Sequence, residues 1–148
     1  AEAPPVLEVV KAEPREEVET AADDEERKEQ IAHYIDIGFE AKEQGDTTEA
    51  ILEFLRALDA GPEPQLILLL GIEVSQLYAQ QGNYDDAIGI LLRIKPEICK
   101  EKQVRVQKEL NYLQALKKLL DQAGLSGMPV SRVPRFYKMR AEEIARSK

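Results

Sequence analysis

The residue types that most often carry enzyme chemistry are scarce in this sequence. It contains one histidine, His33, and one cysteine, Cys99. His33 lies beside Tyr34 with no nucleophile motif near it, so we expect a surface or partly packed histidine rather than a general base. Cys99 is expected to pack as a small apolar residue. Neither residue predicts a catalytic site.

Carboxylates are abundant, but their spacing does not predict a metal site. The run DDEE, from Asp23 to Glu26, lacks the alternating ligands and the glycine of a calcium loop. No cysteine and histidine cluster has zinc spacing, and no phosphate-binding G-x-x-x-x-G-K-[ST] motif occurs. We therefore expect no enzyme activity, no catalytic residue, no cofactor and no metal, and we favour a binding protein.

The charge is distributed unevenly along the chain. The net charge is −8, which favours solubility and makes general nucleic-acid binding unlikely. Residues 1–30 carry 4 Lys/Arg and 11 Asp/Glu, whereas residues 101–148 carry 11 and 5. One end is therefore acidic and the other basic, which predicts electrostatic association within the molecule or with a partner.

The apolar residues recur at helical spacing, and no segment predicts a strand. We expect an all-α fold with helices over about 30–44, 50–58, 65–81, 84–94, 102–123 and 136–146. Residues 1–29 contain too few apolar residues to offset the entropy of ordering, so they predict an acidic leader that is disordered or only partly ordered. Its one apolar run, Val6 to Val10, is expected to belong to a loose tail rather than to add to a partner.

Two segments repeat each other 37 residues apart. GDTTEAILEFLRAL begins at Gly45 and GNYDDAIGILLRIK begins at Gly82. Asp46 and Asn83 follow these glycines, and both residue types are favourable helix N-caps. The identical pairs are Gly45/Gly82, Ala50/Ala87, Ile51/Ile88, Leu55/Leu92 and Arg56/Arg93.

This pattern resembles the tetratricopeptide repeat, a helix–turn–helix hairpin that stacks on its neighbours. The first unit matches through Tyr34, Ile37, Gly38, Gly45, Ala50, Phe54, Ala57 and Pro62. The second matches through Ser75, Tyr78, Gly82, Tyr84, Ala87 and Leu91, but it departs from the pattern at Gly71 and Cys99. The resemblance implies about two full repeats, 31–64 and 68–101, in a short right-handed solenoid within a domain of residues 30–125. A capping helix over 102–123 and a basic tail over 126–148 would follow.

The resemblance also implies a non-catalytic scaffold that holds a protein or peptide in a concave groove. The matching groove positions are Ile35, Phe39, Lys42, Glu43, Ile72, Gln76, Ala79 and Gln80. Only Lys42 is cationic, so the grip on a terminal carboxylate that some family members have is not expected. The apolar positions suit an amphipathic helix or an extended peptide. The alternative is that the protein's own capping helix or tail covers them.

The tail combines cations with aromatic residues: Arg132, Arg135, Phe136, Tyr137, Lys138 and Arg140. One interpretation is docking to an acidic protein surface or to anionic lipid headgroups. Stacking on RNA or DNA is another interpretation, and a solvated terminal helix resting on the acidic repeats is the third.

We therefore expect an adaptor for protein–protein interaction, with self-association or a regulatory subunit of an enzyme as alternatives. No apolar run is long enough to span a bilayer, so membrane contact would be indirect, through a membrane-associated complex. A cytoplasmic or membrane-associated location is favoured. The first residues, AEAPP, also fit a segment that follows a cleaved signal, so export stays an alternative.

Overall fold

The computed structural model describes the backbone of residues 3–148 and the side chains of residues 22–148. Within these residues the chain forms helices and no strand, which confirms the prediction of an all-α fold. The α-helices are α1 (Ala3–Glu43), α2 (Thr47–Asp59), α3 (Pro64–Gln80), α4 (Tyr84–Ile94), α5 (Lys100–Gln122) and α6 (Arg135–Arg146). Two short 3-10 helices, Lys95–Glu97 and Val130–Arg132, lie in the connections.

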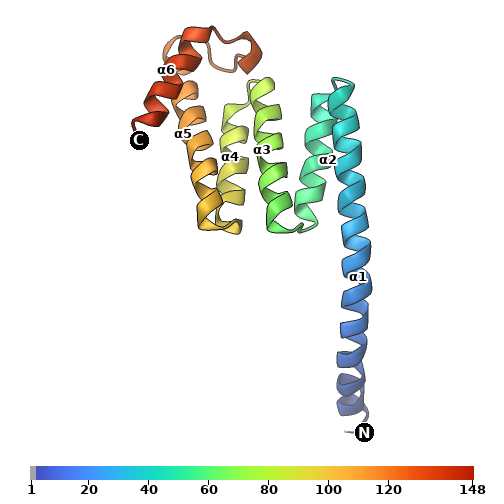
Figure 1. Ribbon diagram of the computed structural model, residues 1–148. Coiled ribbons are helices and arrows are strands. Elements are labelled where there is room, and N and C mark those ends of the chain that lie inside the picture. The colour runs from blue at the N-terminus through green and yellow to red at the C-terminus, as the bar shows by residue number, and fades with distance from the viewer. Residues whose placement is uncertain (1–2) are drawn as a thin grey trace.

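Helix α1 is much longer than the sequence analysis expected. Its 41 residues include nearly all of the acidic leader, which was expected to be disordered or partly ordered. Figure 1 shows that the first part of α1 projects beyond the ends of the other helices. Alanine, glutamate, lysine and arginine favour helices, and extending an existing helix costs far less than starting one. The side chains of Val6 to Val10 lie outside the described residues.

Helices α1 and α2 form a hairpin held together by small residues. Gly38 of α1 lies against the ring of Phe54 in α2, so closely that a Cβ atom at residue 38 would overlap the ring. Ala50 and Ala57 of α2 are fully buried. Gly45 forms the turn with a φ of +80°, a backbone conformation that side chains disfavour. The small residues therefore allow the two helices to approach each other closely.

Helices α3 and α4 form a second hairpin with a different close contact. Gly71 of α3 lies directly against the side chain of Ile94 in α4, leaving no room for a Cβ atom. The two N-caps also differ. The carboxylate of Asp46 accepts a hydrogen bond from the backbone N–H of Glu49, 3.1 Å away, whereas the Asn83 side chain makes no capping bond. Asn83 is the N-cap residue of α4, as the sequence predicts, but its side chain donates to the side chain of Gln81 instead of capping the helix.

Helix α5 packs against α4, and α6 turns back against α5. The buried side chains of α5 include Val106, Leu110, Leu113, Leu116 and Leu120, as the apolar spacing predicts. Cys99 was expected to be packed, but it is exposed at the start of α5. The neighbouring Ile98 is buried in its place, because the extended backbone at this helix start turns consecutive side chains in different directions.

The connection between α5 and α6 is fixed to the turn of the second hairpin. The phenol of Tyr84 donates a hydrogen bond to the backbone carbonyl of Met128, 2.7 Å away. Gly82 lies so close to the carbonyl of Gly127 that a Cβ atom at residue 82 would collide with it. This glycine therefore serves the turn, with a φ of +78°, and the approach of the connection.

The hairpins lie side by side in chain order and share one core (Figure 1). Polar contacts also join the first hairpin to the second. The ammonium of Lys42 in α1 lies 3.0 Å from the carboxylate of Glu73 in α3. The guanidinium of Arg93 in α4 lies 2.6 Å from the carboxylate of Asp59 in α2. These pairs link corresponding helices of the two hairpins at opposite ends.

Candidate partner-binding surfaces

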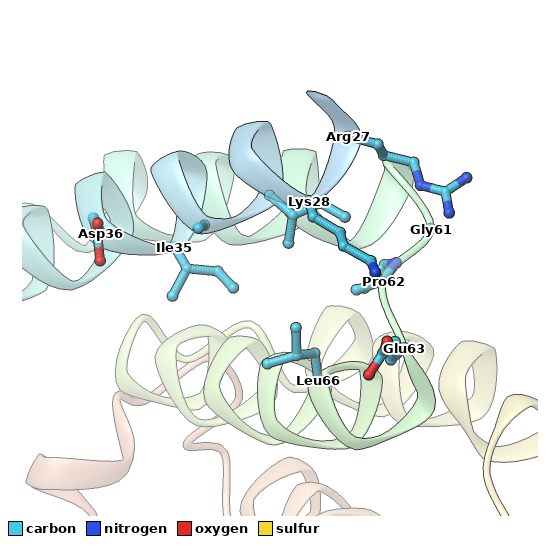
Figure 2. A pocket seen from close by; sticks show the side chains of 10 residues that line it. Arg27, Lys28, Ile35, Asp36, Gly61, Pro62, Glu63 and Leu66 are labelled. Carbon is cyan, nitrogen blue, oxygen red and sulfur yellow. The ribbon is translucent and has the colours of Figure 1, made fainter. Parts of the chain in front are cut away.

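A pocket of about 450 Å³ lies between the middle of α1 and the start of α3. We call it the α1–α3 pocket. Its apolar lining comes mainly from Ile31 and Ile35 of α1, Pro62 of the α2–α3 turn and Leu66 of α3. Figure 2 shows the side chains of Ile35 and Leu66 pointing toward one another across the pocket.

Charged side chains surround this apolar lining. Arg27, Lys28 and Asp36 come from α1, and Glu63 comes from the residue just before α3. Arg27 also contacts Asp24, with a guanidinium–carboxylate distance of 3.1 Å. The pocket therefore combines an apolar centre with a rim of both charge signs, which is the usual make-up of a site that orients a partner by its polar edge.

The α1–α3 pocket lies at the start of α3, where the turn Gly61–Glu63 before this helix forms part of its lining. The Lys42–Glu73 pair joins α1 and α3 nearer the end of α1. The pocket and this ion pair therefore lie at different levels along the two helices.

The predicted groove residues of the first unit have different surroundings. Ile35 is half-buried and lines the α1–α3 pocket. Phe39 packs edge-to-face on Phe54, with ring centroids 5.0 Å apart, so much of its surface serves the core. Lys42 is held by Glu73, and Glu43 is exposed at the last residue of α1, outside the pocket. Of these predicted residues, only Ile35 faces the hollow.

The predicted groove residues of the second unit lie elsewhere. Ile72 is only 6% exposed and belongs to the core. Gln76, Ala79 and Gln80 line a separate hollow of about 290 Å³ between α3 and α5. Tyr112 of α5 and Val130 of the α5–α6 connection line the same hollow. In this unit the protein's own helix and tail cover part of the predicted groove, as the alternative interpretation expected.

Sequence reasoning missed Ile31 and Leu66, which complete the α1–α3 pocket with Ile35. Ile31 was treated as an ordinary member of the helical apolar pattern, and Leu66 was not singled out. Ile31 and Ile35 are four residues apart, so they share one face of α1. That face, together with the Gly61–Glu63 turn before α3, is the signal that could have located the pocket.

Helix α6 carries the predicted basic residues apart from Arg132, which ends the 3-10 helix Val130–Arg132, and α6 packs its other side on α5. Tyr137 and Lys138 are half-buried, and Ala141 is fully buried. Phe136 is 63% exposed, with its ring centroid 4.0 Å from that of Tyr137. Arg132 and Arg135 are exposed, and Arg140 lies 3.1 Å from Glu143. The predicted tail residues are therefore divided between a packed side and an exposed side.

The titratable groups with a shifted pKa lie on α3, α4 and α5, and none of them lines the α1–α3 pocket. Burial, and next the nearby Tyr112, raise the pKa of Tyr84 to about 12. Burial also raises the pKa of Tyr112, helped by Glu142 and Glu109. Hydrogen bonds from Ser126 and Lys117 lower the pKa of the Asp121 carboxyl. Tyr84 and Asp121 both hydrogen-bond to the α5–α6 connection, at Met128 and Ser126, so these two groups fasten it to the hairpin and to α5.

Within residues 22–148, no group of three metal-ligating side chains gathers closely enough to hold a metal ion. Of the helices described between residues 3 and 148, none is long and apolar enough to cross a bilayer. The described part of the chain thus offers hollows and charged helix faces as its candidate sites. No protein-family model, curated protein or solved structure matches this chain.

Proposed function

We propose that this protein is a non-enzymatic adaptor built from tetratricopeptide-like hairpins, and that its α1–α3 pocket binds an amphipathic helix of a protein partner. The repeat of 37 residues, the paired helices and the buried positions of Gly38, Ala50 and Ala57 support the tetratricopeptide-like arrangement. Stacked hairpins of this kind form extended surfaces for partners.

The α1–α3 pocket is the observation that carries the binding proposal. Its volume of about 450 Å³ lies within the usual range for ligand sites. A pocket with an apolar centre between two helices suits apolar side chains that a partner helix presents at i and i+3 or i+4. The charged rim, with Asp36 and Lys28 on α1, would fix the orientation of that helix.

A pull-down that compares the intact chain with Ile35→Glu tests the proposal. A carboxylate at residue 35 would place an unpaired charge in the apolar pocket, so partner capture should fall at least about tenfold. Phe39→Glu is a poorer probe because Phe39 supports Phe54 in the core.

Leu92→Glu is the matched control, since Leu92 is 54% exposed on α4 and lines none of the hollows described above. Both variants must retain the helical circular dichroism and melting profile of the parent. Equal capture by Ile35→Glu and the parent would remove the pocket from the function.

Self-association is the second candidate function. The observation that favours it is the placement of opposite charge at the two ends of the molecule, acidic on α1 and basic on α6 (Figure 1).

A further inference from the structure

The exposed side of α6 is itself an amphipathic surface. Phe136 and Met139 are 63% and 49% exposed and stand three residues apart, so they share one face of the helix. Arg135 and Arg140 are exposed and fall on the same side by their helical spacing. We call these four residues the outer face of α6. It presents two apolar side chains flanked by two guanidinium groups.

This face has no cover in the molecule that carries it. The packed side of α6 is formed by other residues, including the buried Ala141 and the half-buried Ile144. Large apolar side chains exposed together, within a charged surround, mark surfaces that contact other molecules.

The apolar residues of the outer face of α6 suit the apolar centre of the α1–α3 pocket, and its positive charge suits the acidic stretch of α1 beside that pocket. The rim itself carries two cations, Arg27 and Lys28, and two anions, Asp36 and Glu63. The pocket offers an apolar centre lined by Ile35 and Leu66. Residues 22–36 of α1 carry six Asp/Glu and two Lys/Arg, a net charge of −4. Residues 132–148 carry two Asp/Glu and six Lys/Arg, a net charge of +4. The apolar contact and the charge therefore favour the same pairing.

The two surfaces belong to opposite ends of the row of helices (Figure 1). Helices α4 and α5 lie between them, and α3, α4, α5 and α6 pack successively on one another. Because α6 is packed on α5, it cannot reach the α1–α3 pocket of its own molecule without giving up that contact. A second molecule can present its α6 without such a loss.

We propose that the outer face of α6 of one molecule docks in the α1–α3 pocket of a second copy of this chain. This inference rests on the proposed function, because it names a partner helix for the same pocket. The contact is head-to-tail: each molecule offers one pocket and one α6 face. Two molecules that make the contact reciprocally form a closed two-fold dimer, and otherwise repetition of the contact produces rings or open chains of molecules.

Sedimentation velocity of the full-length chain, over a concentration series up to about 1 mM, tests the inference. The parent should form dimers or larger species as the concentration rises. Phe136→Glu and Ile35→Glu should each weaken association at least about tenfold, because each places a carboxylate in the apolar contact. Raising the ionic strength from about 0.05 M to about 0.5 M should also weaken it.

Mixing the two variants provides the sharpest result. Phe136→Glu keeps an intact pocket, and Ile35→Glu keeps an intact outer face of α6. Their mixture should therefore form a one-to-one complex that grows no further, because the remaining pocket and α6 face are both blocked. Asp36→Lys, at the exposed rim, is a second pocket variant in case Ile35→Glu does not fold; it should also reduce association and form a complex with Phe136→Glu.

Several outcomes would overturn the inference while leaving the proposed function standing. A parent chain that stays monomeric at about 1 mM would do so, as would association that Phe136→Glu does not weaken. A mixture of variants without a complex would place the contact elsewhere. Flotation of the parent with phosphatidylserine vesicles, lost in Phe136→Glu, together with a monomeric parent, would assign the outer face of α6 to a lipid surface instead. If Ile35→Glu abolished partner capture in the pull-down, the pocket would still be a binding site.

Discussion

The first and second hairpins use the same spacing but exchange large and small residues across their helix contact. In the first hairpin, α1 has Tyr34 where α3 has Gly71, 37 residues later. The facing helices show the reverse, with Ala57 in α2 and Ile94 in α4. One turn further along, both hairpins place a small residue on the first helix, Gly38 or Ser75, and a large one on the second.

This exchange explains how Gly71 can depart from the family pattern without leaving a hole. The Ile94 side chain occupies the space that a large residue at 71 would fill. Interiors are close-packed, so the quantity that must be kept is the combined volume at each level of the helix contact, not the residue at each position. The two hairpins therefore fill the same helix contact with large and small residues placed on opposite helices. Mutations at these positions can test that statement.

The largest effect is expected from Phe54→Ala, because Phe54 is fully buried and fills the space at Gly38. Its loss should lower the free energy of unfolding by about 3–5 kcal/mol, measured by urea denaturation. Leu91→Ala is the equivalent change in the second hairpin and should cost about 2–4 kcal/mol. A clearly larger loss for Leu91→Ala would show that the two levels are not equivalent.

A double-mutant cycle at Gly71 and Ile94 sharpens the comparison. Gly71→Ala alone overpacks the contact and should cost about 1–3 kcal/mol, while Ile94→Ala alone leaves a cavity and should cost about 2–4 kcal/mol. The double variant should be more stable than the sum of the two losses predicts, by about 0.5–2 kcal/mol. Strict additivity would mean that the two residues do not share one space.

Tyr84→Phe should have a smaller effect, because it removes one hydrogen bond to the carbonyl of Met128. We expect a loss of about 1 kcal/mol at neutral pH. The pKa of Tyr84 is raised to about 12, above the ordinary value of 10.0. The folded state therefore keeps its proton where the unfolded state has lost it, and stability falls as the pH rises from about 10 to about 12.

The same change should reduce that alkaline loss. Urea denaturation of the parent and of Tyr84→Phe at pH values between about 9 and 12 measures it. Tyr84 has no equivalent phenol in the first hairpin, where Thr47 occupies the matching position. An unchanged alkaline slope in Tyr84→Phe would show that other groups dominate the titration.

The smallest effect is expected at the ion pair between the hairpins. Arg93 and Asp59 are both largely exposed, so Arg93→Ala should cost at most about 1 kcal/mol, and less at high salt. Asp59→Ala is the matched partner change and should give a similar loss in the same thermal unfolding assay. A loss above about 2 kcal/mol would mean that this pair does more than bridge the surface.

Most of the fold could be predicted from the sequence because local signals mark it. Gly45 and Gly82 end helices with left-handed backbones, and the apolar spacing identifies the buried sides of α2, α4 and α5. The start of α1 was not predicted, because a low apolar content limits packing but does not prevent a helix from continuing. Cys99 was misplaced because composition says nothing about the direction of a side chain at a helix start.

The candidate site could be predicted only in part. Ile35 was identified through the family resemblance and does line the α1–α3 pocket. The other predicted groove residues do not line this pocket. They lie in the core, in the Lys42–Glu73 ion pair or in a second hollow, and Glu43 lies on exposed surface at the end of α1. Position within a repeat predicts which face of a helix a residue occupies. The pocket, however, also depends on the path of the turn between α2 and α3, and residue spacing alone does not reveal that path.

The fastening of Gly127 and Met128 onto the second hairpin has a consequence for how the chain can vary. Surface connections normally accept added or deleted residues with little effect. Here one side of the connection is clamped at the Gly82 turn and at Tyr84, and the other leads straight into α6. The connection is therefore fixed to the second hairpin. A change in its length would alter the direction of α6 and leave both hairpins intact.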